Sequence, residues 1–204
     1  NEEDAQLSAR FSNQLVDGAK TNAFVIENEA ELDGLSESDK AAFADNAKAK
    51  GLAGQWLLPL HNTTQQPVLA SLNNREVRRR LYEASCNRAE RGDAADTRAT
   101  ILRLAALRAE RAALMGFPNY AAWKLQDQMA ETPEAVDRFF AGLMPLLAAK
   151  TAEEAVAVKA RMEAQHAGAD LQPWDWDFYA EQVRKARYDM DESEVKPYFE
   201  LWKV

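Results

Sequence analysis

Apolar residues recur at helical spacing over most of the chain. The strongest pattern lies in residues 133–165, where apolar side chains fall at steps of three and four. They are Val136, Phe139, Phe140, Leu143 and Leu147. The spacing predicts an amphipathic helix with Phe139, Phe140 and Leu143 on its core face. Thr132 precedes this helix, and its hydroxyl can accept a backbone hydrogen bond from the first turn.

Other segments carry weaker helical periodicity, capping residues or helix-ending glycines. They predict helices at residues 2–19, 37–50, 74–91, 94–115, 119–126 and 175–187. Gly18 should end the first of these helices, Ser36 should cap the second, and Asn119 should cap the short helix that runs through Gln126. Two short β-branched or aromatic runs, 23–26 and 54–60, predict strands that pair as a ribbon. The sequence therefore predicts a mainly α fold, a multi-helix array with one small two-stranded β ribbon.

This order of elements suggests two subregions. Residues 1–72 would form a helix plus the β ribbon, and residues 73–204 would form a helical subregion. The chain of 204 residues is long enough for one ordinary domain or two small lobes. Its 47% hydrophobic and 28% charged residues are typical of a globular protein.

The net charge of −8 argues against nucleic acids and anionic membranes as partners, because an acidic surface repels their phosphates. Four arginines do cluster, at positions 75, 78, 79 and 80. We interpret this run as a solvated helix face. No apolar run approaches the length of about 18–20 residues that crosses a bilayer.

Cys86 is the only cysteine, so an intrachain disulfide is impossible. Its place within a helical pattern, with no histidine nearby, predicts a buried and unreactive thiol. Together with the absence of a visible signal peptide, this favours the cytoplasm. The chain begins at Asn1 and ends at Val204 without the usual marks of natural ends, so we expect both ends to be cut.

Candidate catalytic chemistry is scarce. The two histidines, His61 and His166, lie about a hundred residues apart, and no H-E-x-x-H motif occurs. A catalytic zinc site needs three protein ligands, so we expect no metal site in this chain. Nucleophile elbows and glycine-rich phosphate loops are absent as well. No catalytic residue is therefore assigned.

The densest unusual cluster is Pro173-Trp174-Asp175-Trp176-Asp177-Phe178-Tyr179, which precedes two arginines and another tyrosine. Two interpretations stay open. Aromatic residues and ion pairs could anchor this helix to a neighbour, with Asp175 capping its start. Alternatively, the helix could line a ligand groove, since Tyr and Arg offer polar groups at an apolar wall. The candidate site residues are Trp174, Asp175, Tyr179, Arg184, Arg187 and Tyr188.

Blocks spread over nearly the whole chain resemble, in order, the thimet-oligopeptidase family of zinc peptidases. The blocks are Leu7–Asn22, Glu31–Leu35, Asn73–Arg78, Leu114–Ala121, Pro173–Tyr179, Arg187–Asp189 and Pro197–Phe199. Within the family they are most similar to the bacterial peptidyl-dipeptidase (dipeptidyl carboxypeptidase) branch. Trp202 departs from the pattern, which leads us to expect a small polar or acidic residue there.

The resemblance implies a helical neurolysin/thimet-oligopeptidase-like fold with a deep channel. It also implies a zinc site in a later segment, where two His and a Glu bind zinc and another Glu activates water. That segment is absent from this sequence. The resemblance therefore implies a non-catalytic portion of a cytoplasmic oligopeptidase, whose partners are peptide substrates and the remaining catalytic half. The six candidate residues on the aromatic helix would then belong to the channel wall or a hinge.

Two alternatives stay open beside a parent enzyme that removes C-terminal dipeptides. One is an endo-acting oligopeptidase of the same family. The other is a helical interaction or scaffold protein without an enzymatic parent. If the parent is either kind of oligopeptidase, we expect this chain to have an apolar surface that other parts of the parent would cover.

Overall fold

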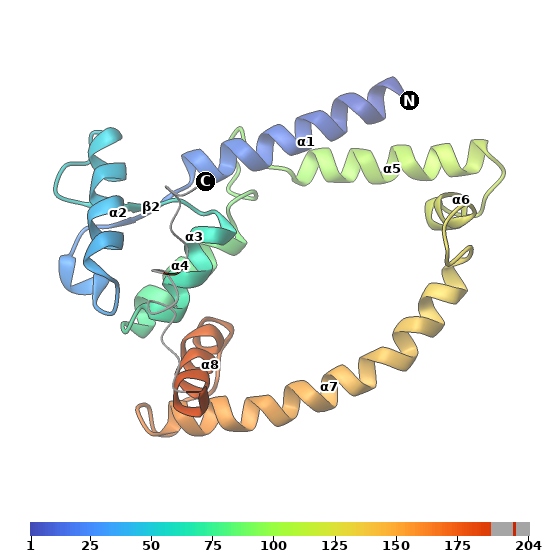
Figure 1. Cartoon of the computed structure of the whole chain (residues 1–204). Helices are drawn as coiled ribbons and strands as arrows, with labels where there is room; N and C mark the ends of the chain where they lie inside the picture. The colour runs from blue at the N-terminus through green and yellow to red at the C-terminus, as the bar shows by residue number, and fades with distance from the viewer. Residues whose placement is uncertain (189–197, 199–204) are drawn as a thin grey trace. The chain divides into compact units, whose positions relative to one another are not determined.

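The computed structural model describes residues 1–188 and residue 198. Within them the helices are α1 (Glu2–Thr21), α2 (Glu37–Ala49), α3 (Asn62–Ser71), α4 (Arg75–Cys86), α5 (Arg98–Leu114), α6 (Tyr120–Leu125), α7 (Pro133–Glu163) and α8 (Pro173–Tyr188) (Figure 1). Strands β1 (Phe24–Ile26) and β2 (Trp56–Leu58) pair in a two-stranded sheet, and η1 (Glu29–Leu32) is a 3₁₀ turn. The predicted mainly α fold with a small β ribbon is confirmed. The predictions about Asp189, Pro197, Phe199 and Trp202 lie outside the described residues.

The structure divides into two compact units whose segments alternate along the sequence. The first contains Asn1–Val25, Leu57–His61 and Glu83–Ala152, and the second contains Ile26–Trp56, Asn62–Tyr82 and Glu153–Val204. The subregion boundary expected between residues 72 and 73 stays a prediction.

In the first unit, α1 lies alongside α5 (Figure 1). Gln14 of α1 is buried; its amide donates to the Asp96 carbonyl at 2.7 Å and accepts from the Thr100 hydroxyl at 2.9 Å. Gly18 does not end α1 as we expected, because the helix continues to Thr21. A Cβ at Gly18 would lie 3.2 Å from the Arg88 carbonyl oxygen, so this glycine permits a close approach instead.

The predicted helix at residues 94–115 begins four residues later, at Arg98. The preceding residues form turns in which aspartates satisfy backbone donors: Asp93 accepts from the Ala95 N–H and Asp96 from the Arg98 N–H. Asn119 caps α6 as predicted, since its side chain accepts from the Ala122 N–H at 2.8 Å.

The predicted core face of α7 is wrong. Phe139 is 65% exposed and Phe140 is 50% exposed, while Leu143 is only half-buried. The buried residues of α7 are Val158 and Met162, in its last turns. Helical periodicity identifies an apolar stripe but does not establish that another element covers it.

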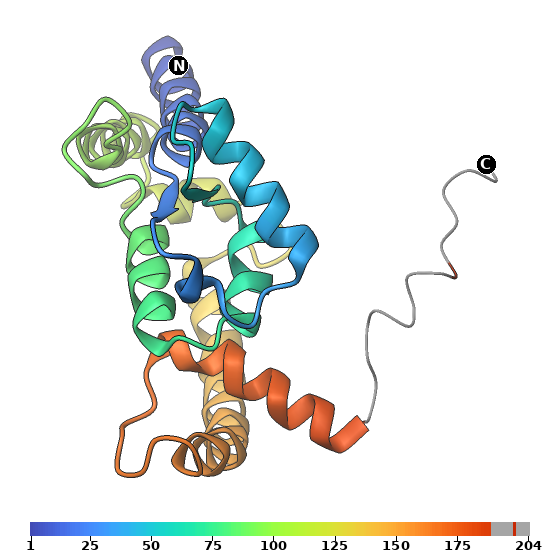
Figure 2. The same cartoon turned by 90° about the vertical axis from the view of Figure 1, so that its left-hand side faces the viewer.

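In the second unit, α2, α3 and the first turns of α4 each contribute buried apolar side chains. They are Phe43, Ala47, Val68, Leu69, Val77 and Leu81, and Leu72 between α3 and α4 is buried as well. Ser36 caps α2 as predicted, accepting from the Asp39 N–H at 3.1 Å. We did not expect α3, whose sequence is polar and contains Pro67. A further cluster joins Val158 and Met162 to Phe178 and Tyr179 of α8. Thus α8 lies beside α3 and the start of α4 (Figures 1 and 2).

Candidate functional site

Asp175 is the centre of an ion-pair network between α4 and α8. Arg75 donates to its carboxylate through Nε, at 3.0 Å from Oδ1 and 3.2 Å from Oδ2, and through Nη2, at 2.7 Å from Oδ2. Arg78 Nη2 donates to Oδ1 at 3.2 Å. The side chains of Asp175 and Arg78 are fully buried, whereas that of Arg75 is partly exposed. Charge-assisted hydrogen bonds of this kind are stronger than neutral ones, so the network ties the first turn of α8 to α4.

Arg78 makes further contacts that only a guanidinium can combine. Its Nη1 donates to the carbonyl oxygens of Leu72 at 2.7 Å and Asn73 at 3.0 Å, and its Nε donates to that of Trp174 at 3.3 Å. Its guanidinium carbon also lies 4.0 Å from the centroid of the Phe178 ring. A planar group with donors in several directions suits this position, and a lysine would lose most of these contacts.

Two sequence interpretations are corrected here. The arginine run is not simply a solvated face, because Arg78 is buried and Arg75 holds a buried carboxylate. Asp175 is not the residue that caps the start of α8, because the helix begins at Pro173. Instead its Oδ2 accepts from the preceding Gln172 N–H at 3.1 Å, which is the reach-back half of a capping box.

The pKa of the Asp175 carboxyl follows from these contacts. Burial alone would raise it, but the hydrogen bonds from Arg75, the Gln172 N–H and Arg78 outweigh burial and lower the pKa below its usual value. Asp175 is therefore a stable anion at neutral pH. A carboxylate held in this way is suited to structural fixation rather than to proton transfer.

The other candidate residues divide along α8. Trp174 packs edge-on against Tyr82, with ring centroids 6.2 Å apart, and Tyr179 is fully buried. Toward the end of the helix, Arg184 is paired with Glu181, whereas Arg187 and Tyr188 are exposed. These last residues line a small groove of about 190 Å³ together with residues of α7. The other lining residues are Glu154, Ala157, Val158, Trp176, Ala180 and Val183. The structure therefore groups Trp174, Asp175 and Tyr179 at one end of α8 and Arg184, Arg187 and Tyr188 at the other.

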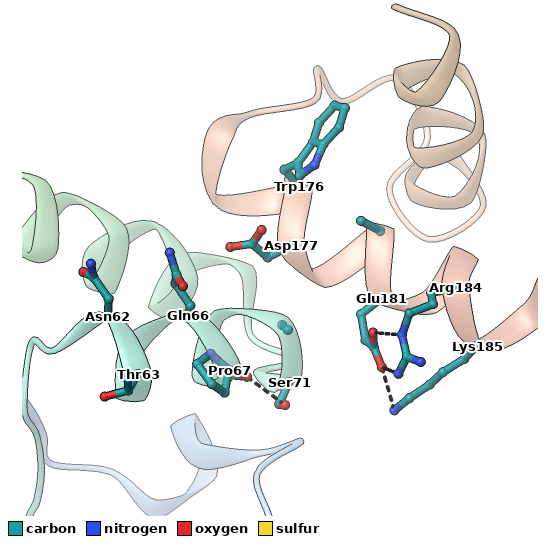
Figure 3. A pocket seen from close by; sticks show the side chains of 12 residues that line it. Asn62, Thr63, Gln66, Pro67, Ser71, Trp176, Asp177, Glu181, Arg184 and Lys185 are labelled. Atoms are coloured by element: carbon teal, nitrogen blue, oxygen red, sulfur yellow. Dashed lines mark hydrogen bonds and ion pairs between the residues drawn. The ribbon is translucent and has the colours of Figure 1, made fainter. Parts of the chain in front are cut away.

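A larger groove of about 660 Å³ lies between α3 and α8 (Figure 3). The wall formed by α3 presents mostly uncharged polar side chains. It consists of Asn62, Thr63, Gln66, Pro67, Ala70 and Ser71. The wall formed by α8 presents Trp176 and the four charged side chains in the groove, which are Asp177, Glu181, Arg184 and Lys185.

Asp177 is the unusual residue of this groove. Its carboxylate points toward α3 (Figure 3), and among the described residues no donor bonds to it. Asp177 is exposed, but nearby atoms of the groove remove part of its hydration, and this partial desolvation raises the pKa of its carboxyl. The sequence placed Asp177 in the aromatic cluster but gave no sign that no donor from the described residues bonds to it.

The described residues contain no group of three or more His, Cys, Asp or Glu side chains that could hold a metal ion. His61 and His166 are both exposed, and they lie outside the helices.

Cys86 is also exposed, so its predicted burial is wrong. The buried position on that turn of α4 is Ser85, four residues after the buried Leu81. In the part of the chain with described structure, no helix has the length and apolar character to cross a membrane.

Sequence reasoning missed Arg75 and Arg78 as partners of α8. A usable signal did exist: Arg78 lies three residues before Leu81 and next to Val77, on the apolar side of α4. A charge at such a position needs a buried partner, because an unpaired buried ion is very costly. The sequence alone could not say that the partner lies 97 positions away.

Comparison with known proteins identifies relatives over nearly the whole chain. A family model described as "Peptidase family M3" matches residues 68–204. Over 201 residues the chain is 47% identical to "Dipeptidyl carboxypeptidase" of Escherichia coli (strain K12), covering 98% of this chain and 30% of that protein. The protein of the same name from Salmonella typhimurium is 44% identical with the same coverage. "Oligopeptidase A" of Escherichia coli is 33% identical over 96% of this chain and 29% of that protein. The chain thus spans about 30% of the length of these relatives.

Proposed function

Because the chain belongs to peptidase family M3, we propose that it is a non-catalytic portion of a zinc-dependent oligopeptidase that removes C-terminal dipeptides from short peptides. One observation carries the choice of reaction. The chain is 47% identical to the dipeptidyl carboxypeptidase of Escherichia coli but 33% identical to oligopeptidase A of the same strain, over nearly the same residues. This difference favours the exo-acting branch over the endo-acting one.

The described residues do not fit a catalytic zinc ion. Such an ion needs three protein ligands and an open position, and the described part of the chain gathers no three His, Cys, Asp or Glu side chains. We therefore assign no metal ligand and no catalytic step to this chain. Zinc, the catalytic residues and a cytoplasmic location belong to the proposal for the whole protein.

We propose that α8 contributes to the wall of the substrate channel or to a hinge beside it. Asp175 and Tyr179 would fix the helix, since both are fully buried. Arg184, Arg187 and Tyr188 would face the peptide, because they line a groove near the exposed end of α8. In the whole protein, Arg187→Ala and Tyr188→Phe should then raise KM for peptides without lowering the unfolding midpoint.

The reaction is tested with a longer protein that contains this chain. It should release the C-terminal dipeptide from an unblocked pentapeptide, lose activity with a chelator, and regain it with zinc. A C-terminally amidated pentapeptide should be a poor substrate for an exo-acting enzyme and a good one for an endo-acting enzyme. The present chain, assayed in parallel, should hydrolyse neither peptide.

Each other result has a defined meaning. Chelator-sensitive internal cleavage would replace the exo-acting reaction with the endo-acting alternative. A longer protein without metal-dependent hydrolysis would favour the scaffold alternative. Hydrolysis by the present chain alone would contradict its assignment as a non-catalytic portion.

A further inference from the structure

The middle of α7, residues 139–149, contains only apolar residues. Its sequence is Phe-Phe-Ala-Gly-Leu-Met-Pro-Leu-Leu-Ala-Ala, and it lies between the charged residues Arg138 and Lys150. A helix at the surface of a globular protein keeps charged or polar side chains on one face. A helix that is apolar all round is normally buried, so this composition indicates a segment that another part of a protein covers.

Within the described part of the chain, this segment is open to solvent. Every residue of it is exposed except Leu143, which is half-buried. The exposed fraction reaches 69% at Leu146. A Cβ added at Gly142 would meet no atom within 4 Å, so the helix is open on that side as well. The middle of α7 therefore presents apolar surface to solvent over about three turns.

The segment has two faces that differ in the size of their side chains. At about 100° per residue, the large side chains share one face and the small ones share the opposite face. The large ones are Phe139, Phe140, Leu143, Met144, Leu146 and Leu147. The small ones are Ala141, Gly142, Ala148 and Ala149, with Pro145 among them. Small side chains allow a neighbouring helix to approach more closely than large ones do.

Pro145 leaves one polar group on the small face. Because proline has no N–H, it cannot donate the helical hydrogen bond to the carbonyl oxygen of Ala141, four residues earlier. A backbone carbonyl that is covered needs a donor from elsewhere. A segment that covers this face should therefore bring a hydrogen-bond donor to Ala141.

We propose that the middle of α7 is a docking surface for a segment of the same polypeptide outside this chain, which encloses the helix on both faces. The inference rests on the proposed function, because this chain spans about 30% of its relatives' length and the rest of such a parent can supply that segment. The segment brings large apolar side chains to the face of Phe140 and a closely crossing helix to the face of Gly142. A second copy of this chain is a poorer occupant, since a two-fold contact buries the same patch on both copies and leaves the opposite face open.

Hydrogen–deuterium exchange tests the proposal by comparing the present chain with a longer protein that contains it. In the present chain, the amides of residues 139–149 should exchange as fast as those of a solvent-exposed helix. In the longer protein they should exchange at least about a hundredfold more slowly, because a buried helix opens only together with the structure around it. The amides of Val158 and Met162, which are buried already, should exchange slowly in both proteins.

A substitution of Gly142 should have opposite effects in the two proteins. In the present chain, Gly142→Leu should raise the thermal midpoint by about 2–4 °C, because leucine favours a helix and its side chain meets open space. In the longer protein the same change should lower the midpoint, because the leucine would overfill the close contact. Ala160→Leu is the matched control: Ala160 is exposed between the charged residues Lys159 and Arg161, so both proteins should respond to it alike.

A lower midpoint for Gly142→Leu in the present chain would place the covering contact inside this chain and overturn the proposal. Slow exchange of residues 139–149 that appears in the present chain only at high concentration would do the same, because it would identify a second copy as the occupant. Fast exchange in the longer protein would mean that nothing covers the segment. Neither measurement depends on hydrolysis. An inactive longer protein with a protected segment therefore refutes the proposed function alone, and an active one with an exposed segment refutes this surface alone.

Discussion

Replacing Asp175 with asparagine should destabilise the second unit strongly. Asparagine keeps the shape of the side chain but removes the charge that Arg75 and Arg78 share. Arg78 would then be a fully buried guanidinium without a counter-ion. Removing one partner from a buried ion pair costs about 3–5 kcal/mol, because the remaining charge stays desolvated. The expected loss is therefore at least about 3 kcal/mol.

Urea unfolding followed by circular dichroism and tryptophan fluorescence measures this loss, since Trp174 and Trp176 flank the substituted residue. Asp170→Asn is the matched control, because Asp170 is exposed, and it should change stability by less than about 0.5 kcal/mol. If Asp175→Asn behaves like this control, the network does not hold α8 and the reasoning is refuted.

The same residue predicts a pH dependence. The pKa of Asp175 is lowered in the folded chain, so its contribution to stability is fully present above the unfolded value of about 3.9. That contribution is lost as the pH falls below about 3.9 and through the lower folded pKa. Unfolding curves recorded from neutral to acidic pH should lose this component in Asp175→Asn and retain it in Asp170→Asn. Parallel acid profiles for both variants would count against the assignment.

Three further predictions concern single positions. Gly34 has a φ of +95°, and a Cβ there would collide with the Ser71 carbonyl oxygen, so Gly34→Ala should cost more than about 2 kcal/mol. Gly51→Ala, at a φ of +78° with open space around it, should cost only about 1 kcal/mol; equal midpoints in urea would contradict this difference. Phe140→Ser should change the free energy of unfolding by less than about 0.5 kcal/mol and reduce the binding of an apolar dye, because Phe140 is half exposed. A large loss of stability would restore the core-face interpretation. Cys86 is exposed and should react with one equivalent of a thiol reagent without denaturant; reaction only after unfolding would mean that it is buried.

Local signals in the sequence predicted most elements of the fold. The caps at Ser36 and Asn119 formed as expected, because each depends on a side chain and a backbone N–H only three residues away. Apolar periodicity located the long helix α7 for the same reason. The segment of α3 was missed, since Pro67 and several polar residues hide its pattern and tertiary packing of Val68 and Leu69 decides its structure.

Long-range contacts were less accessible. The sequence marked Asp175 as special but could not pair it with Arg75 and Arg78, which lie 97 to 100 positions earlier. The apolar stripe with Phe140 was found correctly, yet its exposure depends on which elements lie beside it. Asp177 was seen only as part of an aromatic cluster, because its place in the groove between α3 and α8 is a property of three-dimensional structure.

The separation between Arg78 and Asp175 also affects how the chain folds. Their contact closes a loop of about a hundred residues, and the entropy lost in closing such a loop must be met before the contact stabilises anything. During synthesis, α4 leaves the ribosome before α5, α6, α7 and α8. Arg78 therefore has no counter-ion until Asp175 has been made. The second unit therefore completes its core late. Until then the cluster of Val158, Met162, Phe178 and Tyr179 cannot form, because two of its four members lie on α8.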